Sequence, residues 1–184
     1  MMKLHDLLLQ KRPAILEKWF QAALETYPAD TSRFLRREKD RFANPVGHAI
    51  SYGMEGLLDQ LFDGNDSAKV SSLLDDIVRI RAVQDFSPSQ AIGFIFTLKR
   101  IIRDVLQSEI RSGNASAEEL FALEARIDSM ALASFDIYMG CRETIYELKA
   151  TQVKNATLKL LERTNLLTEM PEHEPDSNDD SDGK

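Results

Sequence analysis

The sequence has few of the residues that build reactive or metal-binding sites. Its 184 residues include a single cysteine, Cys141, which excludes an intrachain disulfide and any site held by paired cysteines. The three histidines, His5, His48 and His173, stand far apart and match no metal-ligand spacing. The glycine-rich nucleotide signatures and the GxSxG nucleophile motif are also missing. The sequence therefore predicts no enzyme, no metal site and no cofactor.

Long apolar runs are missing as well. The longest uncharged stretches, such as Phe86–Leu98, have thirteen residues, whereas a membrane-spanning helix needs roughly 20 apolar ones. No secretory leader is recognisable around the charged residues Lys3 and Asp6, and cysteine is scarce. We expect a cytoplasmic protein without a membrane span.

The net charge of −7 is concentrated at one end of the chain. Residues 171–184 hold six of the 30 acidic residues and one of the 23 basic ones, which leaves 24 acidic and 22 basic residues elsewhere. A nearly balanced body has no field that attracts nucleic acid, so we expect no nucleic-acid partner. The acidic segment has no apolar residue apart from proline and is expected to be disordered.

What the sequence does contain is helix punctuation, with no sustained alternation of the kind that strands show. Cap residues, prolines and apolar spacing predict an all-α fold. The first three helices are expected over residues 4–27, about 30–42 and 45–62. A fourth helix is expected from residue 66 or 67 to the corner at 84–87, a fifth over 88–111, and a last one that begins at residue 116 and continues for more than fifty residues. Pro13 predicts a kink or a restart in the first helix. Domain boundaries are expected at 1–150 for the helical body, 151–170 for an extension of the last helix, and 171–184 for the tail.

Glycines mark one helix as unusual. Gly47, Gly53 and Gly56 all fall within residues 45–62, and each interior glycine costs a helix about 1 kcal/mol relative to alanine. We interpret them as the site of a close helix crossing, with Gly93 as a plausible partner. The alternative is a weak, kinked helix.

The last helix changes character along its length. A wide apolar face gives way to a narrow seam with the alternating four- and three-residue spacing of a coiled coil. Pairing of this helix with a second copy predicts a homodimer, and an exposed single helix is the alternative. The residues predicted at the interface are Met130, Phe135, Met139, Val153, Leu160 and Leu167.

Two charged clusters are candidates for recognition. Arg79, Arg81, Gln84 and Asp85 lie beside a helix N-terminus, which suits a small anion; the alternative is an internal clamp between Arg81 and Asp85. The second cluster is a run of basic residues interspersed with acids. We expect it to be a solvated helix face, with docking of an acidic partner as the alternative. Its basic members are Arg33, Arg36, Arg37, Lys39 and Arg41.

Four segments resemble a known family. They are Arg12–Trp19, Phe42–His48, Gly53–Leu58 and Arg79–Lys99, and together they resemble the N-terminal sensory domain of RsbR-type and RsbRD-type stressosome regulators, the co-antagonists of the kinase RsbT. The resemblance implies a globin-like helical fold that binds no haem. It also implies a dimer that signals in the stress response along its last helix to a STAS domain.

The sequence departs from that pattern because no STAS-like segment follows Leu167. We therefore expect a stand-alone sensory or regulatory module that acts on an unidentified protein partner. The alternative is a globin-like protein that binds a small ligand, either an anion or haem. Against haem, Ala82–Phe86, where the proximal ligand is expected, has no His, Cys, Met or Tyr.

Overall fold

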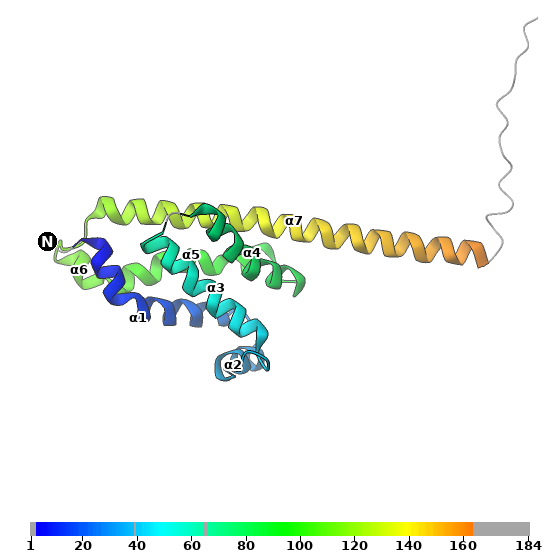
Figure 1. Cartoon of the computed structure of the whole chain (residues 1–184), viewed down its shortest axis with the longest axis horizontal. Coiled ribbons are helices and arrows are strands. Elements are labelled where there is room, and N and C mark those ends of the chain that lie inside the picture. Colours follow the sequence, from blue (N-terminus) through cyan, green and yellow to red (C-terminus); the bar gives the residue numbers. More distant parts are fainter. Residues whose placement is uncertain (1–2, 39, 65, 164–184) are drawn as a thin grey trace, which may run out of the picture. The chain divides into compact units, whose positions relative to one another are not determined.

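The computed structural model describes residues 3–38, 40–64 and 66–163, and within them it contains seven α-helices and no strand. This confirms the predicted all-α fold with a long C-terminal helix (Figure 1). The helices are α1 (Leu4–Leu24), α2 (Ala29–Arg37), α3 (Pro45–Phe62), α4 (Ser67–Val83), α5 (Pro88–Val105), α6 (Gln107–Arg111) and α7 (Ala117–Arg163).

The chain divides into two units, Met1–Thr144 and Ile145–Lys184. The first unit holds α1–α6 and the N-terminal part of α7, and the second holds the remainder of α7 as far as Arg163. The expected tail, residues 171–184, lies outside the described residues. No helix in the described part of the chain is long and apolar enough to cross a membrane.

Local signals set the starts of α3, α4 and α5, as predicted. The side chains of Asn44 and Asp66 each accept a hydrogen bond from the amide three residues further on, at 2.8 and 3.1 Å. Ser87 and Gln90 form a reciprocal capping box, in which each side chain accepts from the other residue's amide. Side-chain caps of this kind satisfy amides that have no partner within the helix.

The helix ends follow the predictions less closely. α1 and α2 end earlier than predicted, at Leu24 and Arg37. α1 also continues through Pro13, so of the predicted kink or restart the structure excludes the restart. The single helix predicted over 88–111 is divided into α5 and α6 at Leu106, which leaves the helical conformation and is fully buried.

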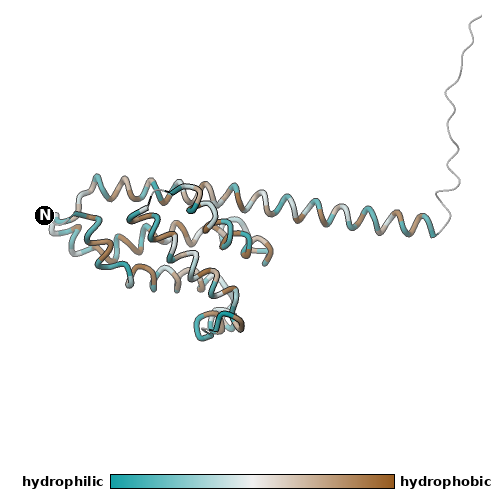
Figure 2. The backbone as a smooth tube through the Cα atoms, in the orientation of Figure 1, coloured by the Kyte–Doolittle hydropathy of each residue, from teal (hydrophilic) through white to brown (hydrophobic). Residues whose placement is uncertain are grey.

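The core of the first unit forms where α1 contacts α3 and α5, and where α4 contacts α3 and α5. Trp19 of α1 is fully buried and stacks on Phe94 of α5, with ring centroids 5.9 Å apart. Its indole N–H donates to the carbonyl of Phe94 at 2.7 Å, which satisfies the one polar atom of the side chain. Figure 2 shows hydrophobic and hydrophilic residues alternating along these helices, as amphipathic packing requires.

The N-terminal part of α7 is joined to other helices of the first unit by polar contacts. Arg103 of α5 donates two hydrogen bonds to Glu124, at 2.5 and 2.6 Å, and Lys99 pairs with Asp128 at 2.5 Å. Arg126 donates to the carbonyls of Gln60 and Gly64 at the end of α3. One apolar stripe of α7 is buried in the same region, made by Leu120, Leu123, Ile127, Met130, Ala131, Tyr138 and Cys141.

Gly53 and Gly56 do mark a close crossing, but with α4 and not with Gly93, whereas a Cβ atom added at Gly47 would meet the side chain of the cap residue Asn44. A Cβ atom added at Gly53 would lie 2.8 Å from Ile77, and one added at Gly56 would lie 2.9 Å from Leu73. A Cβ added at Gly93 would meet nothing within 4 Å. The prediction of Gly93 as the crossing partner is therefore wrong, because spacing along one helix does not identify the helix that covers it.

We predict opposite effects for alanine at two of these positions. Gly53→Ala should lower the free energy of unfolding by on the order of 1 kcal/mol, because overpacking against the buried Ile77 outweighs the gain in helix propensity. Gly93→Ala should raise it by about 0.5–1 kcal/mol through propensity alone. Urea unfolding followed by circular dichroism measures both, and equal stabilities for the two variants would contradict the crossing.

Candidate functional site: the α4–α5 corner and the exposed stripe of α7

The four residues of the predicted anion site do not form one site. Arg79 is exposed and bonds to Asp75, one turn earlier on α4, at 2.8 Å. Gln84 and Asp85 are exposed in the corner between α4 and α5, whereas Arg81 has no solvent exposure at all. The guanidinium of Arg81 is thus out of reach of a dissolved anion in this structure.

Arg81 is bound by backbone and aromatic groups instead of a carboxylate. Its two terminal nitrogens donate to the carbonyls of Ala23, at the end of α1, and Gln90, in the first turn of α5, both at 2.9 Å. Nε has no hydrogen-bond partner among the described residues. Burial lowers the pKa of Arg81, and its interaction with Tyr27 opposes that shift. Three rings lie 4.8–5.4 Å from its central carbon: Tyr27, Phe86 and Phe94.

The predicted clamp between Arg81 and Asp85 is wrong, because Asp85 pairs with α7. Its carboxylate accepts from Arg142 at 2.7 Å, and Arg142 also donates to the carbonyl of Ala82 at 3.1 Å. The hydroxyl of Tyr138 donates to the carbonyl of Phe86 at 2.6 Å. The corner that follows α4 is therefore attached to α7 at several points.

The backbone of this corner is strained at Asp85, which has a φ of 59°. This left-handed conformation is uncommon outside glycine, although aspartate tolerates it better than most residues do. The exposed Gln84 accepts from the hydroxyl of Tyr27 at 3.1 Å, and the Tyr27 ring meets Phe86 edge to face. Tyr27, which follows α1, and Tyr138 and Arg142 of α7 thus all bond to or contact this short turn between α4 and α5.

Sequence reasoning missed Tyr138 and Arg142. Both lie more than fifty residues from their partners in the corner, and no local pattern links them. In the sequence, Arg142 stands out only as the basic residue next to Cys141, which gives no indication of its bond to Asp85.

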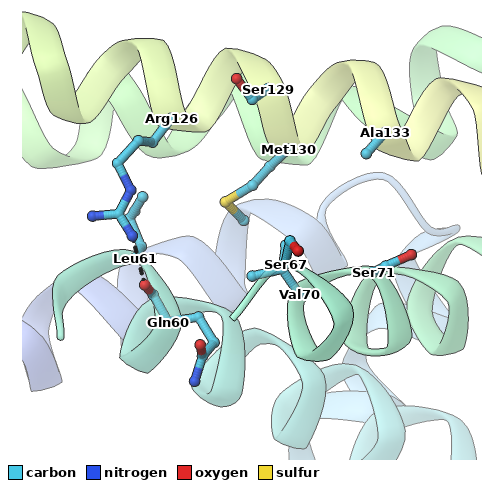
Figure 3. Close-up of a pocket in the computed structure, with 9 residues that line it drawn as sticks. All are labelled: Gln60, Leu61, Ser67, Val70, Ser71, Arg126, Ser129, Met130 and Ala133. Carbon is cyan, nitrogen blue, oxygen red and sulfur yellow. Dashed lines mark hydrogen bonds between the residues drawn. The ribbon is translucent and has the colours of Figure 1, made fainter. Parts of the chain in front are cut away.

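The cleft in Figure 3 has a volume of about 340 Å³ and lies between α3, α4 and the N-terminal part of α7. Met130 points into it from α7, opposite Val70 of α4, and Arg126 lies at one end with a guanidinium bonded to the carbonyl of Gln60. Hydroxyls of serines line the same cleft. None of its lining residues is a histidine, cysteine or carboxylate, and the described residues contain no cluster of three potential metal ligands.

The residues predicted at a dimer interface fall into three groups. Met130 is only 6% exposed and belongs to the core of its own molecule, so it offers little surface to a partner. Phe135 and Met139 in the first unit are partly exposed, as are Val153 and Leu160 in the second, at 46%, 39%, 67% and 61%. Leu167 lies outside the described residues.

One set of the exposed apolar residues of α7 follows a strict repeat, while others, such as Phe121, Leu148 and Leu158, lie outside it. Apolar side chains recur at every seventh residue, and those in the described part are all at least 39% exposed. A seven-residue apolar repeat sustained along a helix is typical of a left-handed coiled coil. Its members are Leu132, Met139, Tyr146, Val153, Leu160 and, outside the described residues, Leu167.

In the first unit, this repeat borders an apolar hollow of about 390 Å³ between α5 and α7. Phe96 of α5 and Leu132 of α7 contribute to its lining and are 51% and 70% exposed. Gly93 and Phe135 also line it. We call this hollow, together with Leu132 and Met139 of the exposed repeat, the apolar face of α7.

These features define an all-helical domain with a closely bonded α4–α5 corner and an exposed apolar face. Residues 13–153 match the family described as the RsbT co-antagonist protein rsbRD N-terminal domain. The chain therefore belongs to this family of stressosome-type regulatory domains, as its motifs predicted.

An uncharacterized protein of Archaeoglobus fulgidus is 27% identical to this chain over 157 residues, which cover 83% of the chain and 90% of that protein. No solved structure gives a significant match.

We predict that the role of Arg81 requires arginine. Arg81→Lys should lower the free energy of unfolding by about 2–4 kcal/mol, because an ammonium on a shorter group neither reaches both carbonyls nor stacks as a plane on the rings. Arg79→Lys is the matched control, since this exposed arginine pairs only within its helix, and it should change stability by less than about 0.5 kcal/mol. Urea unfolding tests the pair. If Arg81→Lys unfolded at the same urea concentration as wild type, the carbonyls and aromatic rings around Arg81 would not be a structural constraint.

Proposed function

We propose that this chain is a non-catalytic sensory and regulatory module that works as a homodimer. In this proposal, a change in the first unit alters the pairing of α7 between the two copies, and the altered helix is read by a separate regulatory protein. The membership of a family named for co-antagonism of RsbT supports a regulatory role.

The single observation that carries the homodimer is the seven-residue apolar repeat of α7. Val153 and Leu160 are more than 60% exposed within a helix that remains regular as far as Arg163. Burying a leucine or valine side chain contributes about 1.5–3 kcal/mol when burial is complete. Pairing with a second copy brings identical positions of the repeat together, so each repeat residue gains a partner of its own kind.

The bonds between the corner and α7 support a relay inside the first unit. Tyr138 and Arg142 bond to the corner, while Leu132 and Met139 on the same helix belong to the apolar face. A shift of the corner relative to α7 must break or rearrange the bonds from Tyr138 and Arg142. Such a shift therefore reaches the helix that we propose as the dimer contact.

A second candidate is binding of a small ligand in the cleft of Figure 3, which has both an apolar floor and polar lining groups. Arg126 is the only charged residue in that lining, and it is already bonded to two carbonyls. We therefore expect acetate, succinate and inorganic phosphate to leave the melting temperature unchanged. A shift in wild type that disappears in Arg126→Ala would favour this second function.

The dimer proposal predicts a specific effect of charge on the apolar face. Leu132→Glu combined with Met139→Glu should weaken dimerisation by at least about tenfold, because two apolar contacts are replaced by facing carboxylates. Tyr52→Glu is the control, since this residue is similarly exposed but lies on α3. Sedimentation equilibrium at micromolar concentration gives the dissociation constants, and a monomeric wild-type protein would refute the proposal.

Truncation gives an independent prediction. Removing residues 150–184 should weaken the dimer without unfolding the helical body, because it deletes the Val153 and Leu160 contacts. Removing only 171–184 should leave the dimer intact, since this segment lacks apolar residues apart from proline. Sedimentation with circular dichroism distinguishes dissociation from unfolding, and a dimer unaffected by the longer deletion would place the contact entirely on the first unit.

A further inference from the structure

The most exposed large hydrophobic side chain in the described part of the chain is Phe42, in the turn between α2 and α3, at 94%. Phe34, on α2, is 51% exposed. α2 itself is anchored to the core mainly through Leu35 and is otherwise largely hydrophilic (Figure 2). Neither phenylalanine belongs to the apolar face of α7, so the proposed dimer does not account for them.

Exposed arginines lie close to these phenylalanines in the sequence. Arg36, Arg37 and Arg41 are exposed, and none of them forms an ion pair or hydrogen bond within the described residues. The neighbouring acids are directed to the backbone: Glu38 accepts from the amide of Asp40 at 2.9 Å, and Asp40 accepts from the amide of the next residue but one at 2.8 Å. The local acids therefore shape the turn and leave the guanidiniums available.

This surface has a defined shape because Asn44 holds α2 and α3 together. The amide nitrogen of Asn44 donates to the carbonyls of Leu35 and Glu38, at 3.0 and 2.8 Å, while its oxygen caps α3. Beside the arginines lies a hollow of about 240 Å³, with Phe20, Leu35 and Gly47 among its lining residues and Arg36 and His48 among the polar ones. A hollow of this size accommodates one apolar side chain.

We propose that the α2 surface, made by Phe34, Arg36, Arg37, Arg41, Phe42 and the adjoining hollow, is the docking site for an acidic segment of a partner protein. Carboxylates of the segment pair with the arginines, and one apolar side chain enters the hollow. An anionic membrane fits less well, since the surface is hollowed next to its cations. The site rests on the proposed regulatory function but not on dimerisation.

The test uses the full chain and fluorescein-labelled peptides of defined sequence. The probe is a peptide of glutamates and aspartates around one central leucine. Two matched peptides replace either the leucine by serine or the acids by glutamine. Fluorescence anisotropy should show binding of the first peptide only, and this binding should weaken with added salt because exposed charge pairs are screened.

Protein variants locate the binding. Arg36→Glu with Arg37→Glu should weaken binding by at least about tenfold, as expected when two charge pairs become repulsive, and Phe42→Ser should weaken it without a change in salt dependence. Arg100→Glu with Arg111→Glu is the control, because both arginines are exposed on other helices, and it should bind like wild type. Melting temperatures confirm that each variant is folded.

Three results would overturn the docking site. One is equal loss in the control variant, which would indicate non-specific attraction. Another is no binding of the leucine peptide at millimolar concentration. The third is stronger binding to phosphatidylserine vesicles that depends on Arg36 and Arg37, which would assign the surface to a membrane. Sedimentation of the same variants separates the two proposals: a stable dimer that binds no peptide refutes only the docking site, and a monomer that binds peptide refutes only the dimer.

Discussion

The buried guanidinium of Arg81 is the constraint on which the first unit depends. Removing a cation from water costs several kcal/mol unless the surroundings replace its solvation. Here the replacement comes from the carbonyl end of α1, where the helix macrodipole favours positive charge, from a carbonyl of α5, and from three aromatic faces. Because these groups belong to different helices, Arg81 is stable only while α1, α4 and α5 keep their relative positions. A single carboxylate partner would have tied Arg81 to one other residue. The carbonyls and rings around Arg81 instead tie it to several segments, and we call this meeting point of α1, α4 and α5 the junction.

The connection from that junction to α7 includes short polar bonds beside the buried side chain of Tyr138. The corner that begins just after Arg81 includes Asp85 in a left-handed conformation, and Tyr138 and Arg142 bind the corner from α7. Strained turns persist only where the surrounding contacts define them. This combination places an exposed turn between the buried core of the first unit and the helix that carries the apolar repeat, and it supports the relay that we propose.

The parts of the structure that sequence could predict are those determined within a few residues. The caps at Asn44, Asp66 and Ser87 satisfy amides three residues away, and the predicted starts of α3, α4 and α5 agree with the structure. The partner of Asp85 could not be predicted, because Arg142 is separated from it by 57 residues and competes with the much nearer Arg81. The same holds for Gly53, whose neighbour across the crossing is a side chain of α4 and not another glycine.

The apolar spacing of α7 shows why helix periodicity alone misplaced one interface residue. Between Leu120 and Cys141, apolar residues recur every three or four positions on two sides of the helix, and periodicity merges both into one wide face. The structure separates them: the side that contains Met130 is buried, while the side that contains Leu132 and Met139 is exposed. A helix that only completes a monomeric core needs one such stripe. The second stripe recurs in the sequence at seven-residue intervals as far as Leu160, and this is why we propose a second copy of the chain as its partner.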